Sequence, residues 1–504
     1  MKKIRKNFRQ YTIRAKITFL ILILSFTVWG YWIIHPQDNL FIGLYNYYFY
    51  NTWCNNFKLY DNLSCGEESL FTQEKFPDFH PGNWQKAVNY FTEKRKTEQN
   101  KPEFLIYLNN AKLMQQEKVT GKKSYTIAIF VPINGDRQDR AESILRGVAQ
   151  VQEEFNQNPQ HPGLKILIVD DANNSSTVYK LAERLLTKKD VVAVIGHYTS
   201  ELTKEALPVY QKNKVVVMSP ATALREAILD GNKFSQNFLF LTNPSVKLQI
   251  PILIQHLQLS NLASGEKVAV FYNKNSTFSK SAFEEFRNQL GANKILEEDI
   301  SISNFIPSRI LNKVKQEGAK VLILFPDGGV NPNSLNNTLG LIDKNQDQLP
   351  IGGQGVLYNE KILNKKLSNR KLSIVITWHR LTSPNNKVID QAINLWGTGI
   401  IDDGTAMSYD ATLVLTKALE NVSINDSLQK QRLDIQQQLT TLQVEEGASG
   451  TISFDEYGDR KENISQIVRV VSVPRKCSEY EAMFVPINYN LSNLKCLEDE
   501  KISR

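Results

Sequence analysis

The sequence predicts an α/β protein whose main part is two doubly wound lobes, preceded by a transmembrane helix and a small helical spacer. Short apolar runs alternate with amphipathic stretches from Tyr125 onward, which is typical of parallel sheets covered by helices. That region spans roughly 350 residues, which exceeds a single core and therefore indicates two lobes. A basic tail and an unbroken apolar run stand at the start of the chain.

The basic tail, residues 1–16, carries most of the formal net charge of +8. It contains seven Lys and Arg residues and no acid, and it is predicted to be cytoplasmic. The rest of the chain is therefore nearly neutral. We expect no nucleic-acid partner, because phosphate binding needs a dense basic surface on the folded part.

The apolar run, residues 17–34, is predicted to be a transmembrane signal anchor. Its 18 uncharged residues are near the lower limit for crossing a hydrocarbon core of ~30 Å, and Trp29, Tyr31 and Trp32 gather toward its far end. A cleaved signal peptide and a buried core helix are the alternatives. The anchor places the protein in the inner membrane as a single-pass protein with its main domain periplasmic.

Two segments separate the anchor from the lobes. Residues 35–81 form an aromatic-rich segment, either resting on the lipid surface or folded as a small disulfide-pinned subdomain. Residues 82–118 have the pattern of one tetratricopeptide-like helical hairpin, with Pro102 opening its second helix. One such unit cannot bury its own apolar face. It is therefore either a spacer docked on the main domain or a partner-binding repeat.

The four cysteines form two close pairs, Cys54 with Cys65 and Cys477 with Cys496, the latter in a C-terminal tail at residues 474–504. Export permits disulfides, and the even count favours local pairing over free buried thiols. Neither pair has the spacing of a structural zinc site.

The predicted strands are seven apolar runs, which begin at Tyr125, Leu164, Val191, Lys214, Lys267, Lys320 and Ser373. The predicted helices between them include Ala141–Phe155, Ser175–Leu186, Ser281–Leu290 and Ile306–Glu317.

Catalytic and cofactor motifs are missing from the sequence. Gly121 and Lys122 resemble the end of a phosphate-binding loop, but Gln116 and Lys123 replace its leading glycine and its hydroxyl residue. The six histidines are not clustered, so no metal site is expected. Asp410 lies within an apolar helical pattern and is predicted to be structural. We therefore predict no enzyme and no cofactor.

Two loops that follow strands and open helices are candidate ligand sites. They are Gly196–Ser200 and Ser219–Ala223. Backbone N–H groups converge at such loops and favour an anion, although each loop is also an ordinary helix cap.

Eight sequence blocks resemble the branched-chain amino-acid-binding family of type I periplasmic solute-binding proteins, in that family's order and spacing. The resemblance covers about Ser124–Val473 and is closest to the anchored cyanobacterial branch. The blocks are FVPI at Phe130, LRGVAQ at Leu145, IVDDAN at Ile168, VIGHYTS at Val194, VVMSPAT at Val216, PIGGQG at Pro350, MSYDATLVLTKAL at Met407 and GTISFDEYGDR at Gly450.

The resemblance implies two Rossmann-like lobes, joined by a three-segment hinge, that close around a ligand. Lobe 1 would comprise about 124–250 and 380–449, and lobe 2 about 251–379 and 450–473. The loop 135–140, which includes Arg140, would lie at the cleft mouth. The implied ligand contacts are Ser200, Glu201, Leu202, Ala221 and Thr222 in lobe 1 and Phe278 and Gln354 in lobe 2. Thr199 is a further candidate ligand residue, and either Thr199 or Ser200 would cap the helix.

Two positions depart from the family pattern. Phe278 replaces a usual tyrosine, and Gln354 replaces the acid that pairs with the ligand's ammonium. A glutamine provides a hydrogen bond without a countercharge. Asp327 or Glu201 would supply the missing charge unless both are solvated loop acids. Arg137 and Arg140 either recognise an anionic ligand or are surface charges.

The expected function is that of a membrane-anchored periplasmic receptor that captures an amino acid or a related small carboxylate, for ABC-type uptake or for sensing. Its expected partners are this ligand and an ABC permease or a membrane signalling protein. The alternative is a tethered scaffold that has lost ligand competence. An exported hydrolase ranks third, because no spacing predicts a nucleophile beside a base.

Overall fold

The computed structural model describes residues 84–133, 137–188, 190–223, 237–364, 371–494 and 496. The predicted basic tail, the anchor at 17–34, the segment 35–81 and the pair Cys54 and Cys65 lie outside the described residues. Within the described ranges, no helix combines the length and apolarity that crossing a membrane requires.

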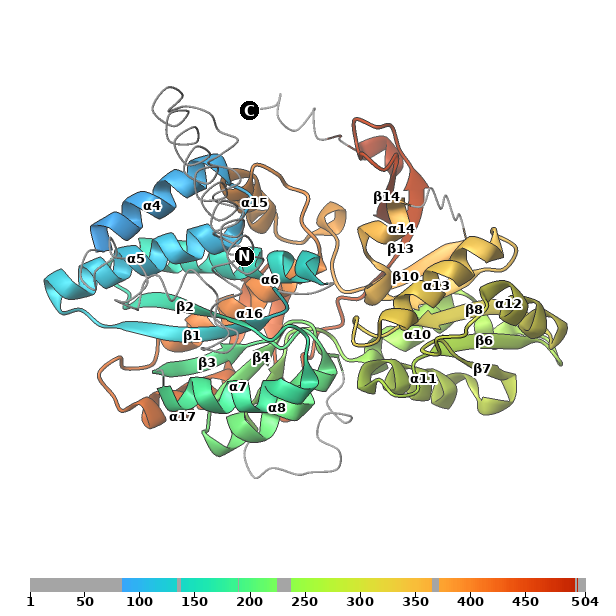
Figure 1. The fold of residues 1–504 in the computed structure, drawn as a ribbon, viewed down its shortest axis with the longest axis horizontal. Coiled ribbons are helices and arrows are strands. Elements are labelled where there is room, and N and C mark those ends of the chain that lie inside the picture. Colours follow the sequence, from blue (N-terminus) through green and yellow to red (C-terminus); the bar gives the residue numbers. More distant parts are fainter. Residues whose placement is uncertain are drawn as a thin grey trace, which may run out of the picture. The chain divides into compact units, whose positions relative to one another are not determined.

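Lobe 1 is built on a five-stranded parallel sheet in the order β2-β1-β3-β4-β5 (Figure 1). All its strands are largely buried, which explains why each is an apolar run rather than an alternating one. The strands are β1 (Ser124–Val131), β2 (Gly163–Asp170), β3 (Val191–Ile195), β4 (Val216–Ser219) and β5 (Leu239–Leu241).

Lobe 2 repeats this strand order as β7-β6-β8-β9-β10 and extends it with two antiparallel strands, β13 and β14. The predicted pair of parallel α/β sheets is therefore confirmed. The strands are β6 (Lys267–Tyr272), β7 (Ile295–Asp299), β8 (Ala319–Phe325), β9 (Ile351–Gln354), β10 (Leu372–Ile376), β13 (Gln466–Ser472) and β14 (Ala482–Pro486).

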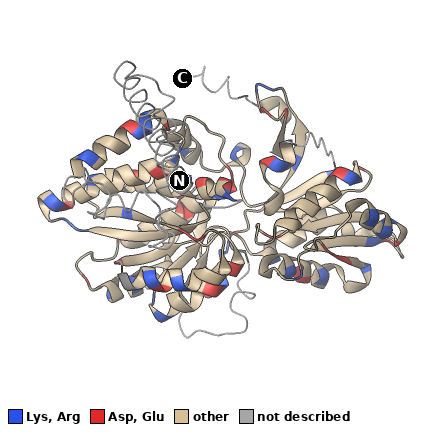
Figure 2. Cartoon of the chain, viewed as in Figure 1, with Lys and Arg blue, Asp and Glu red and all other residues tan. Residues whose placement is uncertain are grey.

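Amphipathic helices cover both sheets (Figure 1). In lobe 1 they are α6 (Gln138–Gln157), α7 (Ser175–Lys188), α8 (Ser200–Lys212), α15 (Lys387–Trp396), α16 (Asp403–Leu419) and α17 (Leu428–Thr441). In lobe 2 they are α10 (Val246–His256), α11 (Thr277–Leu290), α12 (Pro307–Gln316), α13 (Pro332–Asn345) and α14 (Glu360–Asn364). Lys and Arg are interspersed with Asp and Glu along these helices (Figure 2).

The chain crosses between the two sheets three times, at 242–245, 377–386 and 454–465. The third crossing comes later than the boundary expected at 450. Strand β12 (Gly450–Ser453) pairs with β11 (Gln443–Gly447), and Ile452 and Phe454 belong to the core of lobe 1. These apolar side chains keep the segment on lobe 1 until residue 454.

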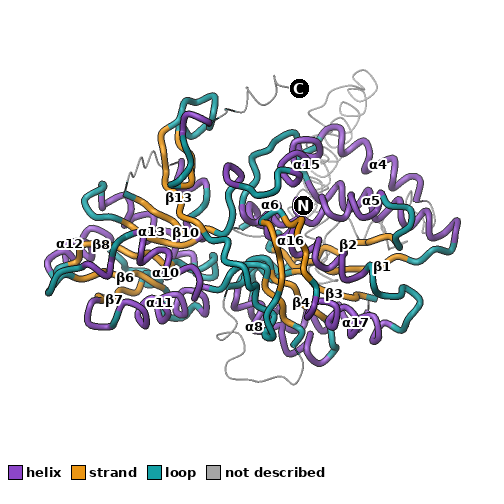
Figure 3. The backbone as a smooth tube through the Cα atoms, turned by 180° about the vertical axis from the view of Figure 1, so that it is seen from behind, coloured by secondary structure: helices purple, strands orange, loops and turns teal. Residues whose placement is uncertain are grey.

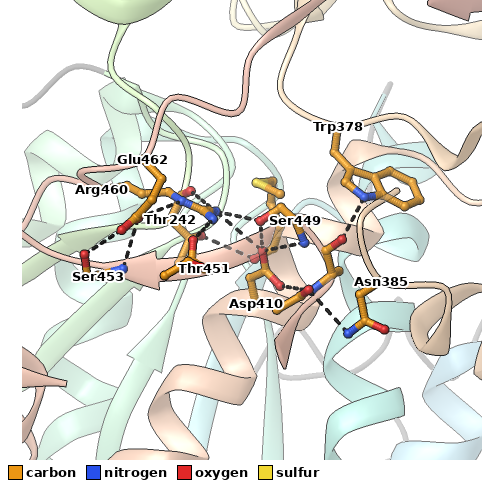
Figure 4. A network of polar contacts seen from close by, with 12 residues as sticks. Thr242, Trp378, Asn385, Asp410, Ser449, Thr451, Ser453, Arg460 and Glu462 are labelled. Atoms are coloured by element: carbon orange, nitrogen blue, oxygen red, sulfur yellow. Dashed lines mark hydrogen bonds and ion pairs between the residues drawn. The ribbon is translucent and has the colours of Figure 1, made fainter. Parts of the chain in front are cut away.

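A buried polar network links the three crossings to α16 (Figure 4). Asp410 accepts hydrogen bonds from the Ala448 N–H at 2.6 Å and from Ser449. Arg460, on the third crossing, lies 3.5 Å from Asp410 and donates to the Thr242 carbonyl at 3.3 Å. Thr242 starts the first crossing. The expectation that Asp410 is structural agrees with these contacts.

The second crossing joins the same network through Trp378. Its indole N–H donates to the Ala448 carbonyl at 3.0 Å, directly beside the N–H that Asp410 receives (Figure 4). One buried carboxylate on lobe 1 therefore organises all three connections between the lobes.

The helical hairpin, α4 (Trp84–Thr97) and α5 (Pro102–Thr120), packs on lobe 1, where α5 lies against α6 and β2. Strand β2 is the edge of the lobe 1 sheet. The buried Asn110 side chain donates to the Ile166 carbonyl at 2.8 Å and accepts from the Ile166 N–H at 3.0 Å. The side-chain amide thus replaces a neighbouring strand, which protects an edge that otherwise invites aggregation.

The C-terminal segment is part of lobe 2 rather than a separate tail. Strand β14 pairs with β13, and a disulfide joins Cys477 to Cys496 as the local pairing predicted. Tyr480, between the two cysteines, donates a hydrogen bond to Glu360 on α14 at 2.8 Å.

Candidate ligand-binding cleft

A cavity of about 110 Å³ lies between the lobes and is lined by residues from both. The loops that follow the parallel strands of each sheet converge on the region between the sheets (Figure 3). Ligands bind at this end of parallel sheets because backbone N–H groups and helix starts gather there.

The first wall is the start of α8. Its N-cap residue, Thr199, makes no capping hydrogen bond with its side chain and donates instead to Asn173 at 3.2 Å. The first N–H groups of the helix therefore have no side-chain cap. Such uncapped N–H groups, together with the helix dipole, favour a carboxylate. Ser200 and Glu201, the first two residues of the helix, both line the cavity.

The loop before α8 is supported by three fully buried side chains, Asp171, His197 and Tyr210. His197 lies 3.0 Å from Asp171 through Nδ1 and 2.8 Å from the Tyr210 hydroxyl through Nε2. Burial raises the pKa of Tyr210 well above its ordinary value, so the hydroxyl stays protonated and donates to Nε2. Nδ1–H then donates to Asp171, which accepts only. The triad fixes the loop between His197 and Ser200 without reaching the cavity wall.

Glu201 joins the two lobes. Its Oε1 accepts hydrogen bonds from the Ser276 hydroxyl at 2.5 Å and from the Phe278 N–H at 3.4 Å, both at the start of α11 in lobe 2. A helix N-terminus favours a negative charge, so this arrangement is electrostatically sound. The other oxygen, Oε2, has no partner.

Arg140 also joins the lobes and is neutralised in place. Its guanidinium lies 3.1 Å from both Asp402 and Asp403, and it donates to the Tyr358 carbonyl of lobe 2. Burial raises the pKa of Asp403 to about 6, although the nearby Arg140 opposes that rise. Arg140 is only 6% exposed, so it is not a surface charge. It lines the cavity and its Nε has no hydrogen-bond partner, so its recognition of an anionic ligand stays a prediction.

Arg137 is buried as well, at 4% exposure, and lies over the Tyr198 ring at 5.2 Å. Tyr198 lines the cavity, whereas Arg137 stands behind it. Among the described residues, no group of His, Cys, Asp and Glu has the arrangement of a metal site.

The structure brings seven of the ten predicted site residues to the cavity wall. They are Arg140, Thr199, Ser200, Glu201, Ala221, Phe278 and Gln354. Three others lie elsewhere. Leu202 packs in the core of lobe 1, and Thr222 has its N–H bound to Ser219 and its hydroxyl to Thr203. Asp327 accepts from Asn273 at 2.7 Å and from the Gly329 N–H at 2.9 Å, which holds its own loop.

Sequence reasoning missed several lining residues. Asn243 and Gln249 follow β5, whose three residues are too few to be recognised as an apolar run. Met407 lies in a recognised block, but its helix was not expected to reach the cleft. The acids that neutralise Arg140 stand at the start of that same helix. The only signal that could have located Asn243 and Gln249 was their position after a strand, and β5 is too short to be recognised reliably as a strand.

A family model described as periplasmic binding protein matches residues 124–476. The chain belongs to this family. Among curated relatives of this periplasmic binding protein, the "Amino acid binding protein" of Pseudomonas aeruginosa is 24% identical over 213 residues, covering 41% of this chain and 54% of the relative. The "Leu/Ile/Val-binding protein homolog 2" of Brucella abortus is 24% identical over 241 residues, covering 46% and 62%. The chain thus spans less than two thirds of the length of these relatives.

Solved structures share the fold of this periplasmic binding protein. A leucine-binding protein of Thermotoga maritima has a TM-score of 0.57 at 18% identity and covers 73% of this chain and 100% of its own. A branched-chain amino acid substrate-binding protein of Streptococcus pneumoniae in complex with isoleucine has a TM-score of 0.57 at 16% identity, covering 72% and 100%. A solute-binding protein of Rhodopseudomonas palustris, in complex with p-hydroxybenzoic acid, has a TM-score of 0.57 at 18% identity, covering 70% and 94%.

Proposed function

We propose that this chain captures a small polar solute, an amino acid or a related carboxylate, between its lobes and releases it unchanged. The observation that carries the proposal is the cavity of about 110 Å³, which is lined by both lobes and flanked by hydrogen bonds between them. The uncapped start of α8 suits a carboxylate. Apolar residues such as Ala221, Phe278 and Met407 suit the rest of a small solute.

The same cavity weighs against the alternative of a scaffold that has lost its ligand. A blocked cleft would have side chains filling the space and pairing one another's polar atoms. Here Asn243 and Gln354 line an open cavity and each keeps an oxygen without a partner. Buried polar atoms of this kind are expected to be paired when a site is occupied.

The proposal also includes attachment of the chain to the membrane. Residues 17–34 would anchor the chain, residues 1–16 would stay in the cytoplasm, and the lobes would face the periplasm to serve an ABC permease or a membrane sensor. On alkaline carbonate extraction, the full chain should stay with the membranes and a variant lacking residues 1–34 should be released. Retention of the shortened chain would contradict the anchor.

Ligand capture is tested on the full-length protein in detergent by thermal shift against amino acids and small carboxylates, with mass spectrometry of any copurified solute. A ligand at 100 times its Kd stabilises the folded state by about 2.7 kcal/mol, which is readily measured. Ala221→Trp, which fills the cavity, should abolish the shift. Ala263→Trp, at an exposed loop position, should preserve it. No shift with any solute, together with no copurified solute, would refute the proposal.

A further inference from the structure

A second cavity, of about 680 Å³, lies between the lobes beside the second crossing, whose residues His379 and Arg380 line it. We call this cavity the side groove. Its lobe 1 wall includes Arg146 on α6 and Ile400, and its lobe 2 wall includes the loop 475–480. The volume is in the range of ligand pockets, so the side groove has room for a guest.

The lobe 2 wall of the side groove carries positive charge that is not neutralised. Within the described ranges, the exposed side chains of Arg475 and Lys476 take part in no ion pair. The four acids that line the groove already interact with other side chains. They are Asp139, Asp402, Glu360 and Glu479. An acidic occupant would therefore meet two free cations.

The lobe 1 wall offers an apolar contact instead. Ile400 is 44% exposed, which is unusual for a large apolar side chain in this chain, and it faces the same groove as Arg475 and Lys476. An occupant that combines acids with an apolar side chain would suit both walls.

Residues 497–504 continue the chain from the edge of the side groove. Cys477 lines the groove, and its disulfide to Cys496 places the start of this segment beside Arg475 and Lys476. The segment reads LEDEKISR, with three consecutive acids at Glu498–Glu500. Four extended residues span at most ~14 Å, so these acids stay close to the wall. So short a tether gives an effective concentration on the order of millimolar, at which weak ion pairs suffice for docking.

We propose that residues 497–504 dock in the side groove and bridge the two lobes. The acids Glu498–Glu500 pair with Arg475 and Lys476 on lobe 2, and Ile502 covers Ile400 on lobe 1. The docked segment adds a link between the lobes outside the three crossings, so a movement of the lobes has to break or rearrange it. The inference goes beyond solute capture and does not depend on it.

An acidic segment of another protein is the competing occupant, because it would suit the same two cations. The chain's own segment is favoured by its tether, since docking it costs no translational freedom. The two occupants differ in what the groove protects. Only docking of the chain's own segment shields Lys501 from a protease.

The first test measures how fast trypsin cleaves after Lys501 in the full-length protein in detergent, as an initial rate followed by mass spectrometry. Arg475→Gln together with Lys476→Gln leaves the sequence around Lys501 unchanged. This double variant should speed the cleavage at least about twofold, because two ion pairs are lost. Lys122→Gln together with Lys123→Gln, an exposed pair of cations outside the groove, should leave the rate as in the wild type.

The second test measures amide hydrogen exchange at residues 398–402, on the lobe 1 wall, from the side of the segment. Glu498→Gln, Asp499→Asn and Glu500→Gln together should speed exchange there, because the segment leaves the groove. Glu445→Gln together with Glu446→Gln, exposed acids on β11 outside the groove, should not.

Two results overturn the inference. One is an equal rate of cleavage after Lys501 in the wild type and in the Arg475 and Lys476 double variant, which would leave the groove to another occupant. The other is unchanged exchange at residues 398–402 when the three acids are neutralised, which would remove the bridge to lobe 1. Both results leave solute capture standing, because neither measurement uses a solute.

Discussion

Replacing Arg460 with methionine tests whether the network at the three crossings depends on a buried ion pair. The side chains of Arg460 and Asp410 are both 0% exposed and lie 3.5 Å apart. Removing one partner of such a pair costs about 3 to 5 kcal/mol, because the remaining charge is buried without compensation. We expect Arg460→Met to lower the free energy of unfolding by this amount at about pH 8, where Asp410 of the wild type is ionised.

The pH dependence of that loss follows from the pKa of Asp410. Burial raises this pKa to about 6 even though Arg460 lowers it, so removing Arg460 raises it further. A carboxyl whose pKa is higher in the folded state favours folding at low pH, and that advantage disappears as pH rises through the folded pKa. The cost of Arg460→Met should therefore grow between about pH 5 and pH 8, by at most about 1.4 kcal/mol per pH unit.

Asp410→Asn should show the opposite trend. The variant lacks the carboxyl whose protonation favours the folded wild type at low pH, so its cost should shrink as pH rises. Urea unfolding of the two single variants and the double variant at both pH values provides the measurement. Lys430→Met, at the exposed pair with Asp434, is the control and should change nothing. A cost for Arg460→Met that is below about 1 kcal/mol at pH 8, or that does not vary with pH, would refute the reasoning.

Two further predictions concern the edge of lobe 1 and the second crossing. Asn110→Ala should lower the free energy of unfolding by about 2 to 4 kcal/mol in a urea titration, because both backbone groups of Ile166 lose their partner. The side-chain amide nitrogen of Asn109 has no hydrogen-bond partner, so the control Asn109→Ala should cost clearly less in the same titration. Burial lowers the pKa of His379 to about 4, so its stabilising effect is present above about pH 6.5 and is lost as pH falls toward 4, by up to about 3 kcal/mol. Between about pH 6.5 and pH 4, the free energy of unfolding of the wild type should fall by this amount relative to that of His379→Asn. An equal pH dependence of the two proteins would contradict the prediction.

The fold was predictable where strands are buried on both faces. The seven predicted apolar runs correspond to β1, β2, β3, β4, β6, β8 and β10. Strand β9 was missed because two of its four residues are glycines. A Cβ at Gly353 would stand 2.4 Å from Leu357, so close packing rather than strand preference determines the residue there. Strand β7 was missed because it is an edge strand that contains three acids.

The site was predictable only as a set of loops. The strand-to-helix pattern located Ser200 and Ala221 because backbone geometry places such loops in the cleft. It could not show that Thr222 and Asp327 have their hydrogen bonds satisfied by neighbouring residues. Nor could it show that Arg140 meets its partners Asp402 and Asp403 across more than 260 residues of sequence. Those properties depend on long-range contacts, which a local pattern does not contain.

The proposed hinged capture requires the contacts across the cleft to be weaker than those that hold the three crossings. Arg140 and Glu201 both reach from lobe 1 to lobe 2, where they meet a carbonyl and the start of a helix rather than an opposite charge. Each such bond contributes on the order of 1.5 to 3 kcal/mol at most. The crossings, by contrast, are tied to lobe 1 by the buried network around Asp410. In the proposed hinged capture, opening breaks a few hydrogen bonds at the cleft and leaves the network around Asp410 intact.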